Sequence, residues 1–324
     1  MTSAASRQKI YYASATQVNF LVPNITQFGT VDVVITNSNG VKQTTSVLLQ
    51  NSAVGVFTSN STGSGPGAIL NGVTGAASPF LVVTPENGGS DLRTRLAIYC
   101  TGLRYAGNPT QDPSKTNIAA NVVALGMDAA GNPYSFTVEY AGGSDPAFPG
   151  LDQVNIILPA QLDGAGLVTL TISAENLTSN PVTFQVNSLP ASQIALNSFT
   201  LSTNETIGGA GVSGTLSLNG VARNSGFPVS IRSNDPNLIL PNLATIPQGQ
   251  SATTFTIATP STATTKTDTI TVQAAGVTLT ASLQLDPSNL PRLTQFTVTP
   301  PTVQGGTSFQ WDRGHQRGRA ARRK

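Results

Sequence analysis

The 324-residue chain contains little of what most enzymes and metal proteins use. Its single Cys excludes an internal disulfide framework and a Cys-rich metal site, and its single His, His315, excludes most His-ligated zinc sites and most Ser-His relays. Charged residues make up only 10% of the chain, against about 25% in an average domain. No apolar run reaches the roughly 18 residues that a membrane-spanning helix needs, so we expect no membrane span.

The basic charge is concentrated at the C-terminal end. Six of the 17 Lys and Arg residues lie within 313–324, and without residues 310–324 the chain has 11 basic and 14 acidic residues. The body is therefore mildly acidic and offers no basic surface for nucleic acid. The first ten residues are polar and lack the apolar core of a secretory signal peptide.

Apolar residues recur at every second position in most segments. This alternation is typical of strands with one buried face, and short turn signals such as Asn39-Gly40 and Asn219-Gly220 separate the segments. The pattern predicts an all-β fold of tandem immunoglobulin-like β-sandwiches. The alternating groups are Val31/Val33/Ile35, Val168/Leu170/Ile172, Phe199/Leu201, Leu216/Leu218, Val229/Ile231, Phe255/Ile257, Ile270/Val272 and Val277/Leu279.

An internal repeat relates two parts of the chain at an offset of about 136 residues. Residues 17–23 (QVNFLVP) match residues 153–159 (QVNIILP), and Tyr12 precedes the first copy as Tyr140 precedes the second. The second copy has two strand candidates upstream, at 92–100 and 134–140, whereas the first has only 9–13. We therefore expect the first module to be truncated, with the chain starting inside a domain.

A second repeat, at an offset near 97, relates residues 197–209 to residues 293–306 and stops after Phe309. We interpret 310–324 as a basic, disordered tail, and we hypothesise that it is the frame-shifted reading of a further repeat. The predicted organisation is a disordered N-terminus (1–10), a partial module (11–58), a complete module (59–187), a bacterial Ig-like sandwich (188–287), the first strand of another repeat (288–309) and the tail (310–324).

An ordered set of five motifs within residues 11–186 resembles a known family. The motifs are 12–20 (YASATQVNF), 54–58 (VGVFT), 67–71 (GAILN), 96–103 (LAIYCTGL) and 148–155 (FPGLDQVN). Together they are similar to the acidobacterial "Solibacter-type" uncharacterised C-terminal domain. The 98–103 element also resembles the Gly-containing second strand of IPT/TIG-type immunoglobulin-like domains, and residues 194–286 resemble a bacterial Ig-like repeat.

The resemblance implies a location and no chemistry. Such domains usually lie at the C-terminus of large exported proteins, so it implies an extracellular or cell-surface location. The family has no established activity, so the resemblance supplies no catalytic residues. Members usually carry the Gly-containing strand in each half, and the first half of this chain lacks it, which agrees with the predicted truncation.

The carboxylates are sparse and mostly flank turns. A glycosidase needs two facing carboxylates about 5–9.5 Å apart, and Glu139 with Asp145 or Asp152 is the nearest candidate pair. Asp145 and Asp152 could also join loop carbonyls in a Ca²⁺ site, since Ca²⁺ takes six to eight oxygens. In both cases the simpler interpretation is a set of solvated turn and edge residues. We predict no catalytic residues, no enzymatic activity and no cofactor other than a possible Ca²⁺.

Tyr105 and Tyr134 lie near predicted loops and could present exposed rings to a ligand, although tyrosines at a sheet rim explain them equally well. Cys100 follows the alternation of its strand and is predicted to be a small buried residue. The glycine-rich segment 209–214 matches a dinucleotide fingerprint, but an alternating strand follows it rather than a helix, so we interpret it as a loop.

These observations favour a non-enzymatic structural or adhesive module of a larger exported or cell-surface bacterial protein. The alternative is a carbohydrate- or ligand-binding β-sandwich with Tyr105 and Tyr134 at its site. The expected partners are neighbouring domains of the same protein, together with surface glycans or other proteins. An enzyme is the third possibility, and it would require Glu139 to face a second carboxylate in a cleft.

Overall fold

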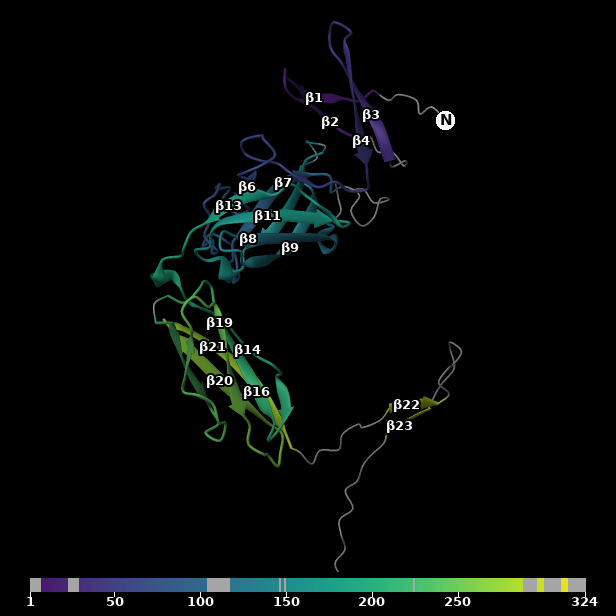
Figure 1. Ribbon diagram of the computed structural model, residues 1–324. Coiled ribbons are helices and arrows are strands. Elements are labelled where there is room, and N and C mark those ends of the chain that lie inside the picture. The colour runs from purple at the N-terminus through teal and green to yellow at the C-terminus, as the bar shows by residue number, and fades with distance from the viewer. Residues whose placement is uncertain are drawn as a thin grey trace, which may run out of the picture. The chain divides into compact units, whose positions relative to one another are not determined.

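The computed structural model describes residues 7–22, 29–103, 117–145, 147–148, 150–223 and 225–287, together with the backbone of 296–299 and 310–313 (Figure 1). Its elements are strands, apart from three short 3-10 helices at Ala119–Asn121, Ala160–Leu162 and Ala191–Gln193. No helix in the described part of the chain is long and apolar enough to cross a membrane. The all-β prediction is confirmed.

The chain divides into two compact units. Unit 1 comprises Met1–Ile194 with Asn219–Val221, and unit 2 comprises Ala195–Leu218 with Ala222–Lys324. The division falls seven residues after the predicted boundary at 187. Tyr105 and most of the N-terminal and C-terminal predicted segments lie outside the described residues.

Unit 1 begins with two separate antiparallel pairs. These are β1 (Ile10–Ala13) with β2 (Val18–Phe20), and β3 (Gly29–Thr36) with β4 (Lys42–Leu49). The predicted buried face of β3 is corrected by the structure, because Ile35 is 44% exposed and Val31 and Val33 are only half-buried. The physical reason is that β3 and β4 pair with each other, and no other described strand pairs with either of them.

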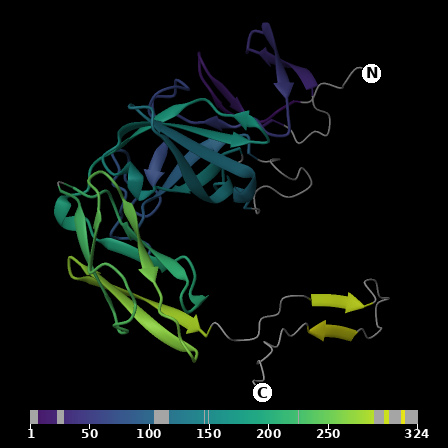
Figure 2. The same cartoon turned by 60° about the horizontal axis from the view of Figure 1, so that its bottom comes forward.

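The rest of unit 1 is a complete β-sandwich (Figures 1 and 2). One layer contains β8, β11, β12 and β13, and the other contains β5, β6, β7 and β10. The long strand β9 joins the layers, because its first residues pair with β8 and its later residues pair with β10. The bounds are β5 Gly55–Val56, β6 Ile69–Asn71, β7 Arg95–Thr101, β8 Val122–Asp128, β9 Pro133–Gly143, β10 Asp152–Ile157, β11 Gly166–Ala174, β12 Leu177–Thr178 and β13 Val182–Val186.

The core of this sandwich contains the residues that alternation predicted. Val168, Leu170 and Ile172 of β11 are fully buried, as are Leu96 and Ile98 of β7. Their outward neighbours are mostly polar, so each strand hides one face of its pleat against the other layer. At about 25 cal/mol per Å² of apolar surface removed from water, this burial is the main contribution to the stability of unit 1.

Unit 2 contains a second sandwich. A three-stranded sheet, β14-β16-β19, faces a five-stranded sheet, β15-β21-β20-β17-β18. Its core again confirms the alternation, since Leu216, Val229, Ile257 and Val272 are buried. The bounds are β14 Leu196–Leu201, β15 Glu205–Ile207, β16 Gly211–Leu218, β17 Phe227–Ser233, β18 Leu243–Ile246, β19 Ala252–Ala258, β20 Lys266–Ala274 and β21 Val277–Asp286.

The prediction that segment 209–214 is a loop is only partly right, because residues 209 and 210 lie in a turn whereas 211–214 belong to strand β16. The segment is followed by a strand and not by a helix, which excludes the dinucleotide fingerprint. Near the C-terminus, β22 (Phe296–Thr299) pairs with β23 (Gln310–Arg313). The predicted tail therefore begins with a short strand instead of disorder, and residues 314–324 lie outside the described part of the chain.

Candidate functional site

A hollow of about 410 Å³ lies on the outer face of the β6-β7-β10 layer of unit 1. We call it the amide hollow. It is lined by residues 70–75 and by Ala97, Tyr99, Gln153 and Asn155. In the strand register Tyr99 lies opposite Gln153 and Ala97 lies opposite Asn155, so the four residues form a compact patch of two neighbouring strands. Its size is within the range of small-ligand sites.

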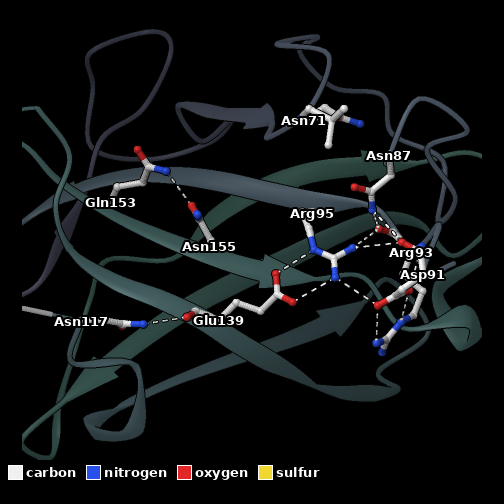
Figure 3. Close-up of polar contacts among 10 residues, drawn as sticks. Asn71, Asn87, Asp91, Arg93, Arg95, Asn117, Glu139, Gln153 and Asn155 are labelled. Carbon is white, nitrogen blue, oxygen red and sulfur yellow. Dashed lines mark hydrogen bonds and ion pairs between the residues drawn. The ribbon is translucent and has the colours of Figure 1, made fainter. Parts of the chain in front are cut away.

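Two side-chain amides that line the hollow, Gln153 and Asn155, are joined by a hydrogen bond (Figure 3). The Ser144 hydroxyl donates to Gln153 Oε1 at 3.0 Å, and Gln153 Nε2 donates to Asn155 Oδ1 at 2.6 Å. Both amides are half-buried and belong to the same face of β10, because they are two residues apart. This series of hydrogen bonds ends at the Asn155 Nδ2 group, for which no described residue supplies an acceptor.

One wall of the hollow is the turn that follows β6. Asn71 Oδ1 accepts hydrogen bonds from the backbone amides of Val73 (2.9 Å) and Thr74 (3.1 Å), and Asn71 Nδ2 donates to Thr84 Oγ1 at 2.8 Å. The Gly72 amide donates to the carbonyl of Arg95 at 2.7 Å. These bonds within the protein fix the turn, so the wall is preformed.

An ion network lies beside the hollow, at the start of β7 (Figure 3). Arg95 binds Glu139 through two bonds, from Nε at 2.8 Å and from Nη2 at 3.0 Å, and its Nη2 also reaches Asp91 at 3.0 Å. Hydrogen bonds from the Arg93 side chain hold the pKa of Asp91 well below its usual range. The bond to Asp91 raises the pKa of Arg93, and the bond to Glu139 raises that of Arg95.

This network neutralises its own charges and holds the loop before β7 against β9. Two cations face two carboxylates, so the network carries no net charge. Glu139, the first member of the candidate glycosidase pair, is an acceptor for both bonds from Arg95. A carboxylate held in this way has a structural role, because it links two strands through its bonds to the arginine.

Glu139→Gln is expected to lower the free energy of unfolding of unit 1 by less than about 1 kcal/mol, because ion pairs that are this exposed contribute little. Urea unfolding measures this change in free energy, and hydrogen exchange in β7 and β9 shows where in unit 1 it occurs. Glu86→Gln, at an exposed position outside the network, is the matched control. A loss several times larger than this would show that the network holds the sandwich together.

The structure places Tyr134 near the start of β9, beside the turn that follows β8. Its hydroxyl donates to Asp128 Oδ2 at 2.9 Å, and its side chain is half-buried. Burial, together with the bond to Asp128, raises the pKa of Tyr134 to about 12. The tyrosine therefore fixes the turn, while Tyr105, its predicted partner in ligand binding, lies outside the described residues.

The two candidate calcium ligands have different environments. Asp145 is exposed and accepts a hydrogen bond from the amide of Ala147 at 2.8 Å, whereas Asp152 is fully buried and accepts one from the amide of Leu103 at 2.9 Å. The described residues contain no group of three or more His, Cys, Asp or Glu side chains that could hold a metal ion. The calcium site stays a prediction.

Cys100 is fully buried, which confirms its prediction as a small core residue. Burial raises the pKa of its thiol. A thiol in such a place stays protonated and unreactive.

Sequence reasoning missed the amide hollow, although one signal was available. The sequence identifies the Gln-Val-Asn triplet of β10 as part of the internal repeat. Its two amides face outward, and nothing in the local sequence indicates that Tyr99, 54 residues upstream of Gln153, lies directly opposite. The pairing of β7 with β10 creates the patch.

No protein-family model and no curated protein matches the chain. Among solved structures, it is similar to the D00-D0 domains of intimin (17% identity, covering 53% of this chain and 96% of that chain, TM-score 0.26). It is also similar to the Yersinia pseudotuberculosis adhesin InvE (13%, 64% and 56%, TM-score 0.23) and to invasin, described as a bacterial integrin-binding protein (16%, 88% and 51%, TM-score 0.23). Because these TM-scores are low, the fold assignment depends on the sheets and cores described above.

Proposed function

We propose that the chain is a non-enzymatic structural and adhesive module of a larger exported or cell-surface bacterial protein. Membership of the Solibacter-type family is part of this proposal. The observation that carries it is the parallel pairing of β15 with β21 in unit 2, where Glu205, Thr206 and Ile207 lie opposite Gln284, Leu285 and Asp286.

This pairing suits a module that transmits tension. β15 is near the beginning of the unit 2 sandwich and β21 is its last strand, so a pull on both ends of the chain moves the two strands in opposite directions along their shared axis. Hydrogen bonds bracket the pair, with Gln284 N donating to Asn204 O at 2.8 Å and Gly208 N donating to Asp286 O at 2.9 Å. All of these hydrogen bonds are loaded at the same time and must break together. The force that unit 2 withstands is therefore set by its rate of unfolding under load.

Force spectroscopy of the full chain tests this role. Unit 2 is expected to unfold in one event that releases roughly 300 Å of chain, at about 3.5 Å per residue. Thr206→Pro removes a backbone donor from the middle of β15, and the force of this event is expected to fall by roughly half. Unit 1 events in the same molecules are the internal control. An unchanged force for unit 2 would remove the main support for the structural role.

Ligand binding is the second candidate function, and the amide hollow favours it. The hollow is concave, its turn wall is preformed, and it displays polar side chains that the core does not use. Adhesion requires a contact surface of this kind in addition to a stable scaffold.

A further inference from the structure

We infer that the amide hollow of unit 1 is a binding site for a neutral saccharide, with Tyr99, Gln153 and Asn155 as its contact residues. This inference rests on the ligand-binding function proposed above and names its site and ligand class. The force experiment on unit 2 is independent of it, so either proposal can fail alone.

The first support is the orientation of the amide chain. Because Ser144 donates to Gln153 and Gln153 donates to Asn155, each amide is held in one orientation. Both N–H groups of Asn155 Nδ2 then remain as donors at the hollow, with no acceptor among the described residues. The Tyr99 hydroxyl is likewise given no hydrogen-bond partner by the described part of the chain. These groups can therefore form hydrogen bonds with the hydroxyl groups of a ligand.

The second support is that the same outward pattern occurs twice in unit 1. In the first module Gln17 Nε2 donates to Asn19 Oδ1 at 2.7 Å, and Tyr12 lies opposite Asn19. In the second module Tyr140 lies opposite Asn155 in the same way, and both strand pairs carry an irregularity in register beside this position. Outward side chains contribute nothing to the core, so burial alone does not explain why these residue types recur.

The two copies differ in what surrounds the amides. Gln17 and Asn19 are exposed, whereas Gln153 and Asn155 are half-buried. In the second module β7 supplies Tyr99 beside Gln153, and the 72–75 turn closes one side. The hollow therefore lies where β6 and β7 flank the pattern, in the complete sandwich.

The third support is the chemistry of the lining, which fits uncharged hydroxyl groups. Amides and a phenol both donate and accept, as sugar hydroxyls do, and the Tyr99 ring offers an apolar face for the C–H side of a sugar ring. None of the described residues that line the hollow is charged, and the nearby ions are paired with one another. A charged ligand would lose its hydration without gaining a counter-charge.

The test is NMR titration of the ¹⁵N-labelled full chain with neutral cello-, xylo-, manno- and galacto-oligosaccharides at millimolar concentration. We expect at least one series to shift the side-chain NH₂ resonances of Asn155, which the variant Asn155→Asp assigns. Tyr99→Ala is expected to abolish the shifts. Asn155→Asp, which keeps the size and shape of the side chain while removing both donors, is expected to weaken binding about tenfold, equal to the loss of about 1.4 kcal/mol.

Ser173→Ala, on the exposed face of β11, is the matched control and is expected to bind like the unmodified protein. Asn155→Asp keeps the test valid if Tyr99→Ala fails to fold. The inference is overturned if no oligosaccharide shifts these resonances, if binding survives in Asn155→Asp unchanged, or if only peptides added as a comparison series produce the shifts.

Discussion

Gly102→Ala is expected to lower the free energy of unfolding of unit 1 by about 4 kcal/mol, enough to leave much of its sandwich unfolded. Gly102 follows β7 at φ +83°, a conformation that residues with a Cβ rarely adopt. A Cβ at this position would lie 2.0 Å from the carbonyl oxygen of Ala53, and backbone atoms cannot rotate away as a side chain can.

The same glycine anchors the segment before β5. The Gly102 carbonyl accepts hydrogen bonds from the Ala53 amide and the Ser52 hydroxyl, both at 3.0 Å. Moving the backbone to relieve the clash would break these bonds as well. Circular dichroism with urea, combined with hydrogen exchange in β7 and β10, measures the loss within unit 1.

Gly131→Ala separates the two causes. Gly131 has nearly the same conformation, φ +86°, but no atom lies within 4 Å of the position its Cβ would take. We expect it to cost only about 1 kcal/mol, which is the cost of the backbone conformation alone. Equal losses in the two variants would contradict the steric argument.

Lys266→Met is expected to destabilise unit 2 by about 2 kcal/mol. Lys266 contacts Asp235 directly and lies 3.4 Å from Asp268, and the two carboxylates are only 9% and 5% exposed. Without the lysine, two buried negative charges remain with no cation, which is the costly way to break such a cluster. This loss is smaller than is usual for buried ion pairs because the lysine side chain is 32% exposed.

Adding Asp268→Asn to Lys266→Met is expected to restore about half of this stability, since it removes one of the two uncompensated charges. Lys42→Met, at an exposed position on β4, is the control and is expected to change little. Hydrogen exchange in β17 and β20 localises the effect to unit 2. If the double variant is less stable than Lys266→Met, repulsion between the carboxylates is not the cause.

The cluster also makes the stability of unit 2 depend on pH. The hydrogen bond from Lys266 lowers the pKa of Asp235, so its contribution is complete above the free-aspartate pKa of about 3.9 and is lost as the pH falls through the lower folded-state value. The bond to Asp235 raises the pKa of Lys266, so that contribution is complete below about pH 10.4 and is lost above it. In Lys266→Met the acid-side loss is expected to shrink.

Sequence alternation determined the strands and most of the core, because a strand's side chains alternate between faces whatever its partners are. It identified Val168, Leu170 and Ile172 correctly, and these are fully buried. It failed at Ile35, where the same pattern occurs on an exposed strand. Alternation shows which face a strand offers for burial, but a second layer must be present to cover that face.

The candidate site shows the same division. The Gln-Val-Asn repeat could be identified from the sequence alone, and the central valine of its second copy, Val154, is buried. The roles of Tyr134 and Glu139 could not be identified from the sequence. Tyr134 bonds to Asp128, six residues away, and Glu139 bonds to Arg95, 44 residues away.

By itself the sequence determined that this is an all-β chain built from repeated modules, since period and repeats are local properties of the chain. Only the tertiary structure decided which polar residues meet. Strand register brings Tyr99 to Gln153 and Asn155, and β15 alongside β21, across long separations in sequence. Register is set by the packing of whole sheets, and no local pattern encodes it.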